Sequence, residues 1–278
     1  MGGQTGRTGE PTMRASPTPI LARTMPAAKV KAVSCAECPL RTLKLFSPVS
    51  PGDLKLIESL RGVQVHKPAG HTLIGEGQAN PPLLTLFAGW AFRFKTLANG
   101  QRQILNFLLP GDLIGLQQRL AENAVHGVEA LTEVWLCPFE RDALWQLHRQ
   151  APALGYSLTW LSAQEEALVD DQLLSVGRRS AESRLAALLV WLFKRAAAVM
   201  PAPEKGGAIK SVPFPLTQQH IADALGLSLV HTHRTVRKLA RRGLYRIEGG
   251  ELHLGNPAEL VQLAELWGDG RPPERPML

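Results

Sequence analysis

The sequence predicts an α+β protein in which an antiparallel β-rich part precedes one long helix and then two short helices with a β-hairpin. Three observations support this order. Short apolar runs separated by Gly, Pro and Asn fill residues 63–139, apolar residues recur at helical spacing after Pro152, and residues 216–254 have the pattern helix, turn, helix, hairpin. A chain of 278 residues is long enough for two domains with separate cores.

The C-terminal part carries the clearest local signals. Thr217 is a good N-cap for a first short helix, Gly226 suits the sharp turn after it, and Ser228 can cap the next helix. The turn at residues 248–251, Glu-Gly-Gly-Glu, can close a hairpin. Together these signals predict a winged helix-turn-helix over residues 178–256.

The second short helix has an inward and an outward face. Thr232, Val236 and Leu239 recur at helical spacing and are expected to pack inward. A DNA major groove admits one helix, and an arginine near its N-terminus can bind guanine O6 and N7, a role for which Arg234 is placed. The residues expected to meet base edges are Leu229, Val230, His233 and Arg234.

Cations near this helix suit the DNA backbone. Phosphate contacts fix the register of a protein on DNA without reading sequence. The alternative is that these cations form only a solvated helix face. The residues expected at phosphates are Thr217, His231, Arg237, Lys238, Arg241, Arg242 and Arg246.

Composition indicates an intracellular protein with a polyanionic partner. The formal net charge is +7 and the pI is about 9.6. Three cysteines are too few for a disulfide scaffold. The longest strongly apolar run, residues 185–193, is far short of the roughly 20 residues that span a membrane, and no secretory leader is evident. We therefore expect a cytoplasmic protein without a membrane partner.

The N-terminal half divides into a tail and a β-rich domain. Residues 1–34 are rich in Gly, Thr, Pro and Arg and are expected to be disordered. Ser50 and Pro51 signal the start of a short helix, and Asn99-Gly100 signals a hairpin turn. Residues 35–150 are therefore predicted to form an antiparallel roll.

The C-terminal stretch resembles the DNA-binding domain of the Crp/Fnr superfamily. In that superfamily the second helix begins with a pattern close to Gly-Leu-Ser/Thr-x-Glu-Thr-x-Ser/Gly-Arg, and four positions here match it: Gly226, Leu227, Ser228 and Arg234. Val230 stands where a base-reading glutamate is usual, and valine can touch a thymine methyl group instead.

This resemblance extends over nearly all of the chain after residue 35. It implies a cyclic-nucleotide-binding-like β-roll as sensor, a long helix that pairs two protomers, and a transcription regulator that binds inverted-repeat, double-stranded DNA as a homodimer. It leaves RNA polymerase open as a further partner, and activation or repression undecided.

The resemblance also indicates where an effector would sit. In cyclic-nucleotide-binding members a Gly-Glu pair contacts the ribose, and an Arg followed by Ser or Thr binds the cyclic phosphate. The corresponding residues here are Gly111 with Asp112 and His126 with Gly127, so the phosphate position lacks a permanent cation unless Arg119 reaches across. A buried phosphate without a cation is costly, and we expect cyclic AMP not to be the effector.

The long helix is predicted over residues 151–177. Its four-three spacing suggests a coiled-coil seam that is apolar at its start and polar at its end. The alternative is a different helical phase, with Glu165 and Glu166 facing water. Residues 257–278 remain as a C-terminal extension. The expected seam comprises Leu154, Leu158, Leu161, Glu165, Leu168 and Gln172.

Candidate cofactor ligands are few. Cys35 and Cys38 form a Cys-x-x-Cys pair, and Cys137 is the remaining cysteine. One superfamily branch holds an iron-sulfur cluster, which normally needs four thiolates, so a cluster is not favoured, while a thiol redox switch and a structural role remain open. Haem is another group that superfamily members use, and the histidines considered for it are His66, His71, His126 and His148.

An enzyme is not indicated. The chain has no Gly-rich phosphate loop, no His-Glu-x-x-His and no nucleophile elbow. The rival hypothesis from another class is a ligand-binding signalling module that acts through protein contacts.

Overall fold

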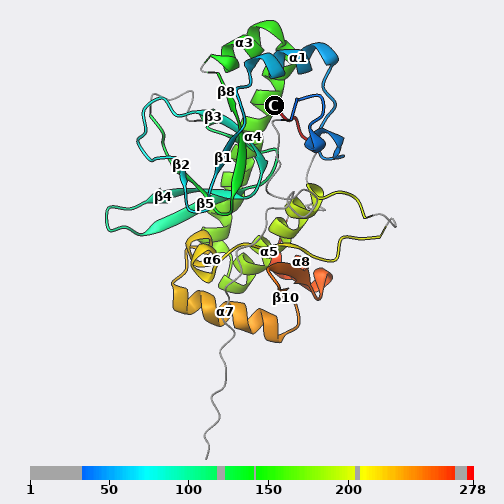
Figure 1. The fold of residues 1–278 in the computed structure, drawn as a ribbon. Coiled ribbons are helices and arrows are strands. Elements are labelled where there is room, and N and C mark those ends of the chain that lie inside the picture. Colours follow the sequence, from blue (N-terminus) through cyan, green and yellow to red (C-terminus); the bar gives the residue numbers. More distant parts are fainter. Residues whose placement is uncertain (1–32, 118–122, 141, 204–206, 267–273) are drawn as a thin grey trace, which may run out of the picture.

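The computed structural model describes residues 33–117, 123–140, 142–203, 207–266 and 274–278 (Figure 1). The expected disordered tail lies outside the described residues, apart from Val33 and Ser34. The remaining chain has the predicted order of β-rich part, long helix and winged helix-turn-helix.

The N-terminal segment leads into the roll through a 3-10 helix, η3 (Pro39–Thr42), and a short α-helix, α1 (Pro51–Leu60). The Ser50 hydroxyl accepts a hydrogen bond from the Asp53 amide at 3.1 Å, and Pro51 occupies the first turn. Both features follow from the sequence, because proline lacks the amide that a first turn leaves unpaired.

Two four-stranded antiparallel sheets form the roll, with strand orders β1-β8-β3-β6 and β2-β7-β4-β5. The β4–β5 hairpin closes through Asn99-Gly100, where Gly100 has a positive φ of 82°. Side chains between the sheets are buried, among them Ile74, Leu86 and Val134. The strands are β1 (Val65–Lys67), β2 (Thr72–Ile74), β3 (Leu83–Ala88), β4 (Ala91–Thr96), β5 (Arg102–Leu108), β6 (Leu113–Ile114), β7 (Gly127–Ala130) and β8 (Val134–Phe139).

Two helices follow the roll, α3 (Ala143–Gln150) and the long α4 (Pro152–Arg178). The start of α4 packs into an apolar cluster with α1 and α3. In Figure 1, α4 runs past the roll toward the C-terminal domain.

The C-terminal domain is organised around α5 (Ala181–Ala198), which contains the apolar run 185–193 and buries most of it. None of the helices in the described part of the chain is both long enough and apolar enough to cross a bilayer. The other elements are β9 (Val212–Pro213), α6 (Gln218–Leu225), α7 (Leu229–Arg241), β10 (Tyr245–Glu248), β11 (Glu251–Leu254) and α8 (Pro257–Ala264).

The C-terminal extension has two described parts. Helix α8 packs against α5, whereas residues 274–278 lie on the roll, where Phe46 and Arg275 form a parallel bridge. Figure 1 shows the C-terminal residues beside the N-terminal coil, far from α7.

Candidate nucleic-acid interface and sensor cavity

Side-chain caps fix the angle between α6 and α7. Thr217 Oγ1 accepts from the His220 amide at 3.2 Å, and His220 Nδ1 accepts from the Thr217 amide at 3.2 Å. Gly226 ends α6 in the left-handed conformation, with φ of 64°. Ser228 Oγ accepts from the His231 amide at 3.2 Å and starts α7. The predicted caps and turn are confirmed.

Helix α7 presents the predicted edge to solvent. Thr232 and Leu239 have no exposed surface, whereas Leu229 and Val230 are 47% and 63% exposed. Arg234 is exposed as well, and His233 is half-buried. Helix α7 is thus oriented with its first turns free to approach a duplex.

The cations of α7 and its C-cap that were predicted to contact DNA, Arg234 at a base and the others at phosphates, fall into two groups. Arg234, Arg237 and Arg241 are exposed and have no hydrogen bond or ion pair with any residue the structure describes. Lys238 and Arg242 both bind Glu182 at the start of α5. A phosphate must therefore compete with Glu182 for these two side chains.

Two further predicted phosphate contacts have protein partners. Arg246 binds Glu248 on the same strand at 3.1 Å, and the Thr217 hydroxyl serves as the α6 cap. Both side chains are exposed enough for exchange with DNA, while His231 is exposed and contributes only its amide to a cap.

The wing is the predicted hairpin. Gly249 and Gly250 have φ of 59° and 78°, which matches the mirror-image turn that joins twisted strands. Tyr245 on β10 donates its hydroxyl to the Val236 carbonyl at 3.1 Å, and burial raises the pKa of Tyr245 to about 12. This bond connects the wing to α7.

The predicted dimer seam on α4 is wrong in its first half. Leu154, Leu158 and Leu161 are buried against the protein's own α1 and α3, and Glu165 pairs with Arg93 of its own roll. Leu168 and Gln172 are half-buried. The four-three spacing identifies the face of α4 that packs on its own sensor domain. A helix that pairs with a second helix and a helix that packs on its own domain need the same period, so the spacing does not distinguish them.

A different face of α4 is exposed. Tyr156 and Leu173 are 73% and 72% exposed, and Val169, Leu174 and Val176 are exposed too. Residues 156, 159, 163, 166, 170, 173 and 177 are all exposed and alternate by three and four. We call these seven positions, together with Val169 and Val176, the outer face of α4.

A cavity of about 550 Å³ lies between the roll, α4 and α5. Of the four predicted effector residues, Asp112 and His126 line it. Gly111 packs against the Phe46 ring and Gly127 against the Phe94 ring, so their role is to allow close packing. Other lining residues are Arg93, Trp160, Trp191, Lys194, Arg195 and Arg275.

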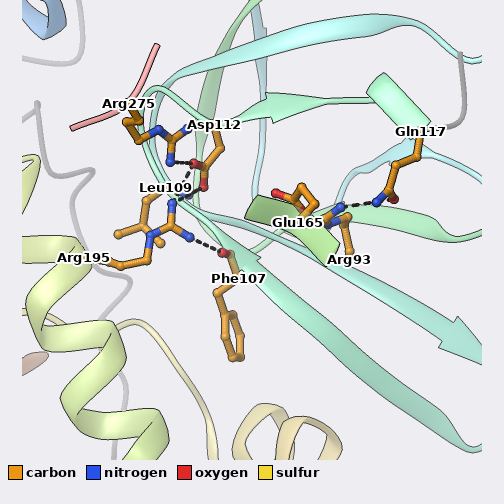
Figure 2. A network of polar contacts seen from close by, with 8 residues as sticks. All are labelled: Arg93, Phe107, Leu109, Asp112, Gln117, Glu165, Arg195 and Arg275. Atoms are coloured by element: carbon orange, nitrogen blue, oxygen red, sulfur yellow. Dashed lines mark hydrogen bonds and ion pairs between the residues drawn. The ribbon is translucent and has the colours of Figure 1, made fainter. Parts of the chain in front are cut away.

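Asp112 is the centre of an ion-pair network (Figure 2). Arg195 Nη2 lies 2.6 and 2.7 Å from its two oxygens, Arg275 Nη1 lies 2.6 Å from Oδ1, and the Leu109 amide donates to Oδ2 at 2.8 Å. Burial alone would raise the pKa of Asp112, but the two guanidinium groups lower it to about 2. Protein donors therefore occupy both oxygens of the Asp112 carboxylate.

Sequence reasoning missed Arg93, a cation in this cavity. Arg93 binds Glu165 of α4 and lies 3.5 Å from Gln117 (Figure 2). Burial lowers its pKa to about 10, so the guanidinium stays charged at neutral pH. An arginine between two phenylalanines, Phe92 and Phe94, was the available signal.

His126 supplies no charge to the cavity at neutral pH. It is buried, and burial together with Arg93 and Lys95 lowers its pKa to about 4. This agrees with the expectation that no permanent cation stands at that position.

The three cysteines come together at another site. Cys35, Cys38 and Cys137 line one small pocket beneath the N-terminal segment and are free. Burial raises the pKa of Cys35 and Cys38, so both side chains are neutral thiols at neutral pH. Within the described residues, no group of three or more His, Cys, Asp or Glu is arranged to hold a metal.

The other histidines considered for haem lie on separate elements. His66 on β1 packs against Trp135 with ring centroids 4.5 Å apart, His71 precedes β2, and His148 is on α3.

Two family models match the chain. Residues 64–151 match a cyclic nucleotide-binding domain, and residues 183–263 match a Crp-like helix-turn-helix domain. The two matches cover the roll and the C-terminal domain described above.

Relatives that match most of this chain are also regulators. The nitrogen fixation regulation protein FixK of Bradyrhizobium diazoefficiens is 31% identical over 230 residues, which is 83% of this chain and 93% of FixK. The transcriptional activator proteins FnrL of Cereibacter sphaeroides and anr of Pseudomonas aeruginosa are each 28% identical, over 77% and 88% of this chain and 85% and 98% of their own lengths.

A solved structure has a similar fold. The solved structure of FixK2 from Bradyrhizobium japonicum superposes with a TM-score of 0.65 at 22% identity, covering 75% of this chain and 99% of FixK2. The relatives are named as regulators, which indicates regulation rather than catalysis. The chain therefore belongs to the Crp/Fnr family of DNA-binding transcriptional regulators.

Proposed function

We propose that this regulator binds inverted-repeat DNA as a homodimer, with one α7 in each half-site. The observation that carries the proposal is the exposed first half of α7, where Leu229, Val230 and Arg234 face solvent directly after a capped turn. Two-fold symmetry would place two such helices about one DNA turn apart.

The outer face of α4 is the proposed dimer contact. It presents Tyr156, Val169, Leu173 and Val176, which are large apolar side chains left exposed by the protomer. Apolar residues recurring at a three-four period on a helix are the pattern that pairs helices. This replaces the seam expected at Leu154 to Gln172.

The cavity is the proposed effector site, with a ligand other than cyclic AMP. Its carboxylate, Asp112, is bound by two arginines, Arg93 is bound by Glu165, and His126 is neutral. A cyclic phosphate would therefore have to displace an ion pair in order to bind Arg93, Arg195 or Arg275. Iron-sulfur and haem ligation stay outside the proposal.

The regulator is proposed to act in the cytoplasm, where its DNA is, and RNA polymerase is the proposed protein partner. FnrL and anr are named transcriptional activators, which supports activation as one of its outputs.

A salt-dependence experiment tests this function. Binding to a duplex selected from a random pool should protect an inverted repeat, and affinity should fall by about 10³-fold or more between 50 and 200 mM salt if six or more phosphates are contacted. Protection of a single half-site, or affinity that ignores salt, would contradict dimeric DNA binding. A chain that binds no duplex would favour the signalling module.

A further inference from the structure

Residues 274–278 are held on the roll by backbone bonds. The Arg275 amide donates to the Leu45 carbonyl at 2.9 Å, and the Ser47 amide donates to the Arg275 carbonyl at 2.9 Å. This alternation is that of a parallel β-bridge, centred on Phe46 and Arg275. The segment therefore pairs with residues 45–47 as an added β-strand would.

The side chain of Arg275 lies in the lining of the 550 Å³ cavity and contacts Asp112, Gly111 and Phe46. Its Nη1 lies 2.6 Å from Asp112 Oδ1, its Nη2 donates to the Gly111 carbonyl at 2.9 Å, and its guanidinium lies 5.8 Å from the centre of the Phe46 ring. Gly111 allows this arrangement, because a Cβ there would lie 2.2 Å from the Phe46 ring.

The next residues are also anchored. Met277 and Leu278 are 3% and 6% exposed. Arg41 donates to the Met277 carbonyl at 3.3 Å, and the buried Thr85 hydroxyl donates to the main-chain oxygen of Leu278 at 3.0 Å. The segment thus contributes two buried apolar side chains in addition to its charged one.

The Asp112 carboxylate also pairs with a second arginine, which belongs to the C-terminal domain. Arg195 on α5 of the C-terminal domain shares Asp112 Oδ1 with Arg275 (Figure 2). The two guanidinium groups approach each other only because Asp112 lies between them. Seating of the segment and docking of α5 on the roll are therefore coupled through one side chain.

We propose that the roll carries a binding groove for an extended segment with an arginine followed by apolar residues, and that residues 274–278 are its ligand within this chain. Its occupation holds α5, and with it the winged helix-turn-helix, against the sensor. We call the groove, formed by residues 41–47, Thr85, Gly111 and Asp112, the strap groove. The inference goes beyond the proposed DNA binding and effector cavity, because it assigns a peptide-binding groove whose Asp112 also lines that cavity.

The direction of the effect follows from α7. Its reading edge is exposed while the strap groove is filled, so the docked state does not mask the DNA-binding surface. Releasing the segment would uncover nothing on α7 and would add freedom between the domains. A DNA-binding domain that moves more freely loses more conformational entropy when it binds. We therefore expect release of the segment to lower the affinity for DNA.

Hydrogen exchange of the full chain tests the groove without DNA. Arg275→Gln removes the charged contacts, and Glu274→Gln is the matched control, since Glu274 is exposed. We expect the amides of residues 45–47 and of Arg275, Met277 and Leu278 to exchange about tenfold faster or more in Arg275→Gln, and at an unchanged rate in Glu274→Gln. Equal exchange in both variants would overturn the groove.

A peptide with the sequence of residues 274–278 gives the second readout. It should bind a chain that ends at residue 273 and fail to bind that chain when it carries Asp112→Asn. Binding that ignores Asp112→Asn would overturn the proposed recognition. If the shortened chain does not fold, the exchange measurement on the full chain decides.

DNA affinity separates this inference from the proposed function. Arg275→Gln should bind DNA severalfold more weakly than Glu274→Gln, and tighter binding would overturn the proposed direction. If the wild type binds no DNA, the proposed function fails, while the exchange and peptide results still decide whether the groove exists.

Discussion

Arg102 on β5 donates from Nε to the Asp223 carboxylate on α6 at 3.1 Å, so the sensor touches the first helix of the helix-turn-helix directly. The same guanidinium lies 4.9 Å from the centre of the Phe92 ring and 3.4 Å from Glu129. The β4–β5 hairpin is therefore a second connection between the domains, separate from Asp112.

Asp223→Asn should lower the free energy of unfolding by about 1–2 kcal/mol, because it weakens a shielded, charge-assisted contact. Glu182→Gln is the comparison. Its partner Lys238 is mostly exposed, and exposed pairs contribute less than about 1 kcal/mol. Urea denaturation of both variants measures the difference. A larger loss for Glu182→Gln would show that the Arg102 contact adds little.

Arg234→Ala should remove preference for one base pair in each half-site, a loss of about 1–3 kcal/mol of discrimination. Arg241→Ala is the control, since a phosphate contact should weaken all sequences alike. Competition with single-base variants of the site measures both. Should Arg234→Ala weaken every sequence equally, Arg234 contacts only the backbone.

Leu173→Glu should reduce the dimer fraction without lowering the stability of the protomer, because Leu173 is exposed on the outer face of α4. Sedimentation at several concentrations measures the dimer, and thermal unfolding of dilute protein measures the protomer. An unchanged dimer fraction would move the interface away from this part of α4.

Glu165→Leu should destabilise the chain by a few kcal/mol, because it leaves the buried Arg93 guanidinium without its carboxylate. Glu140→Leu is a matched control, because Glu140 is exposed and lies outside α4. Chemical denaturation gives both values. Had Glu165 faced a dimer partner as the sequence suggested, its replacement would instead raise the dimer fraction.

His126 should make the wild type lose stability as the pH falls from about 6.5 to 4. Burial lowers its folded pKa to about 4, so in this window the unfolded chain binds a proton that the folded chain does not. His126→Gln should flatten that part of the pH profile of unfolding. Parallel profiles for the two proteins would show that His126 titrates normally in the fold.

The C-terminal domain could be predicted from the sequence because its helix caps and its turn depend on residues that are close together in the chain. Thr217, Gly226 and Ser228 act within one turn of their own positions, and the outward edge of α7 follows from helical period alone.

The ion pairs of the cavity could not be predicted, because their partners are far apart in the chain. Asp112 is bound by Arg195 and Arg275, which are 83 and 163 residues away in the chain. The phase of α4 was misjudged for a related reason. Period predicts which residues share a face, but the partner of that face, here α1 and α3, depends on tertiary packing.

The first half of α4 is packed into the sensor and the second half is not, which limits how a change in the sensor can be transmitted along the helix. Since Leu154, Leu158 and Leu161 are packed into the sensor, the first three turns cannot roll about the helix axis without breaking that cluster. The stretch beyond Leu161 has far fewer buried side chains. We therefore expect a change in the sensor to bend the second half of α4, so that the two α7 helices of the proposed dimer swing apart or together rather than twist.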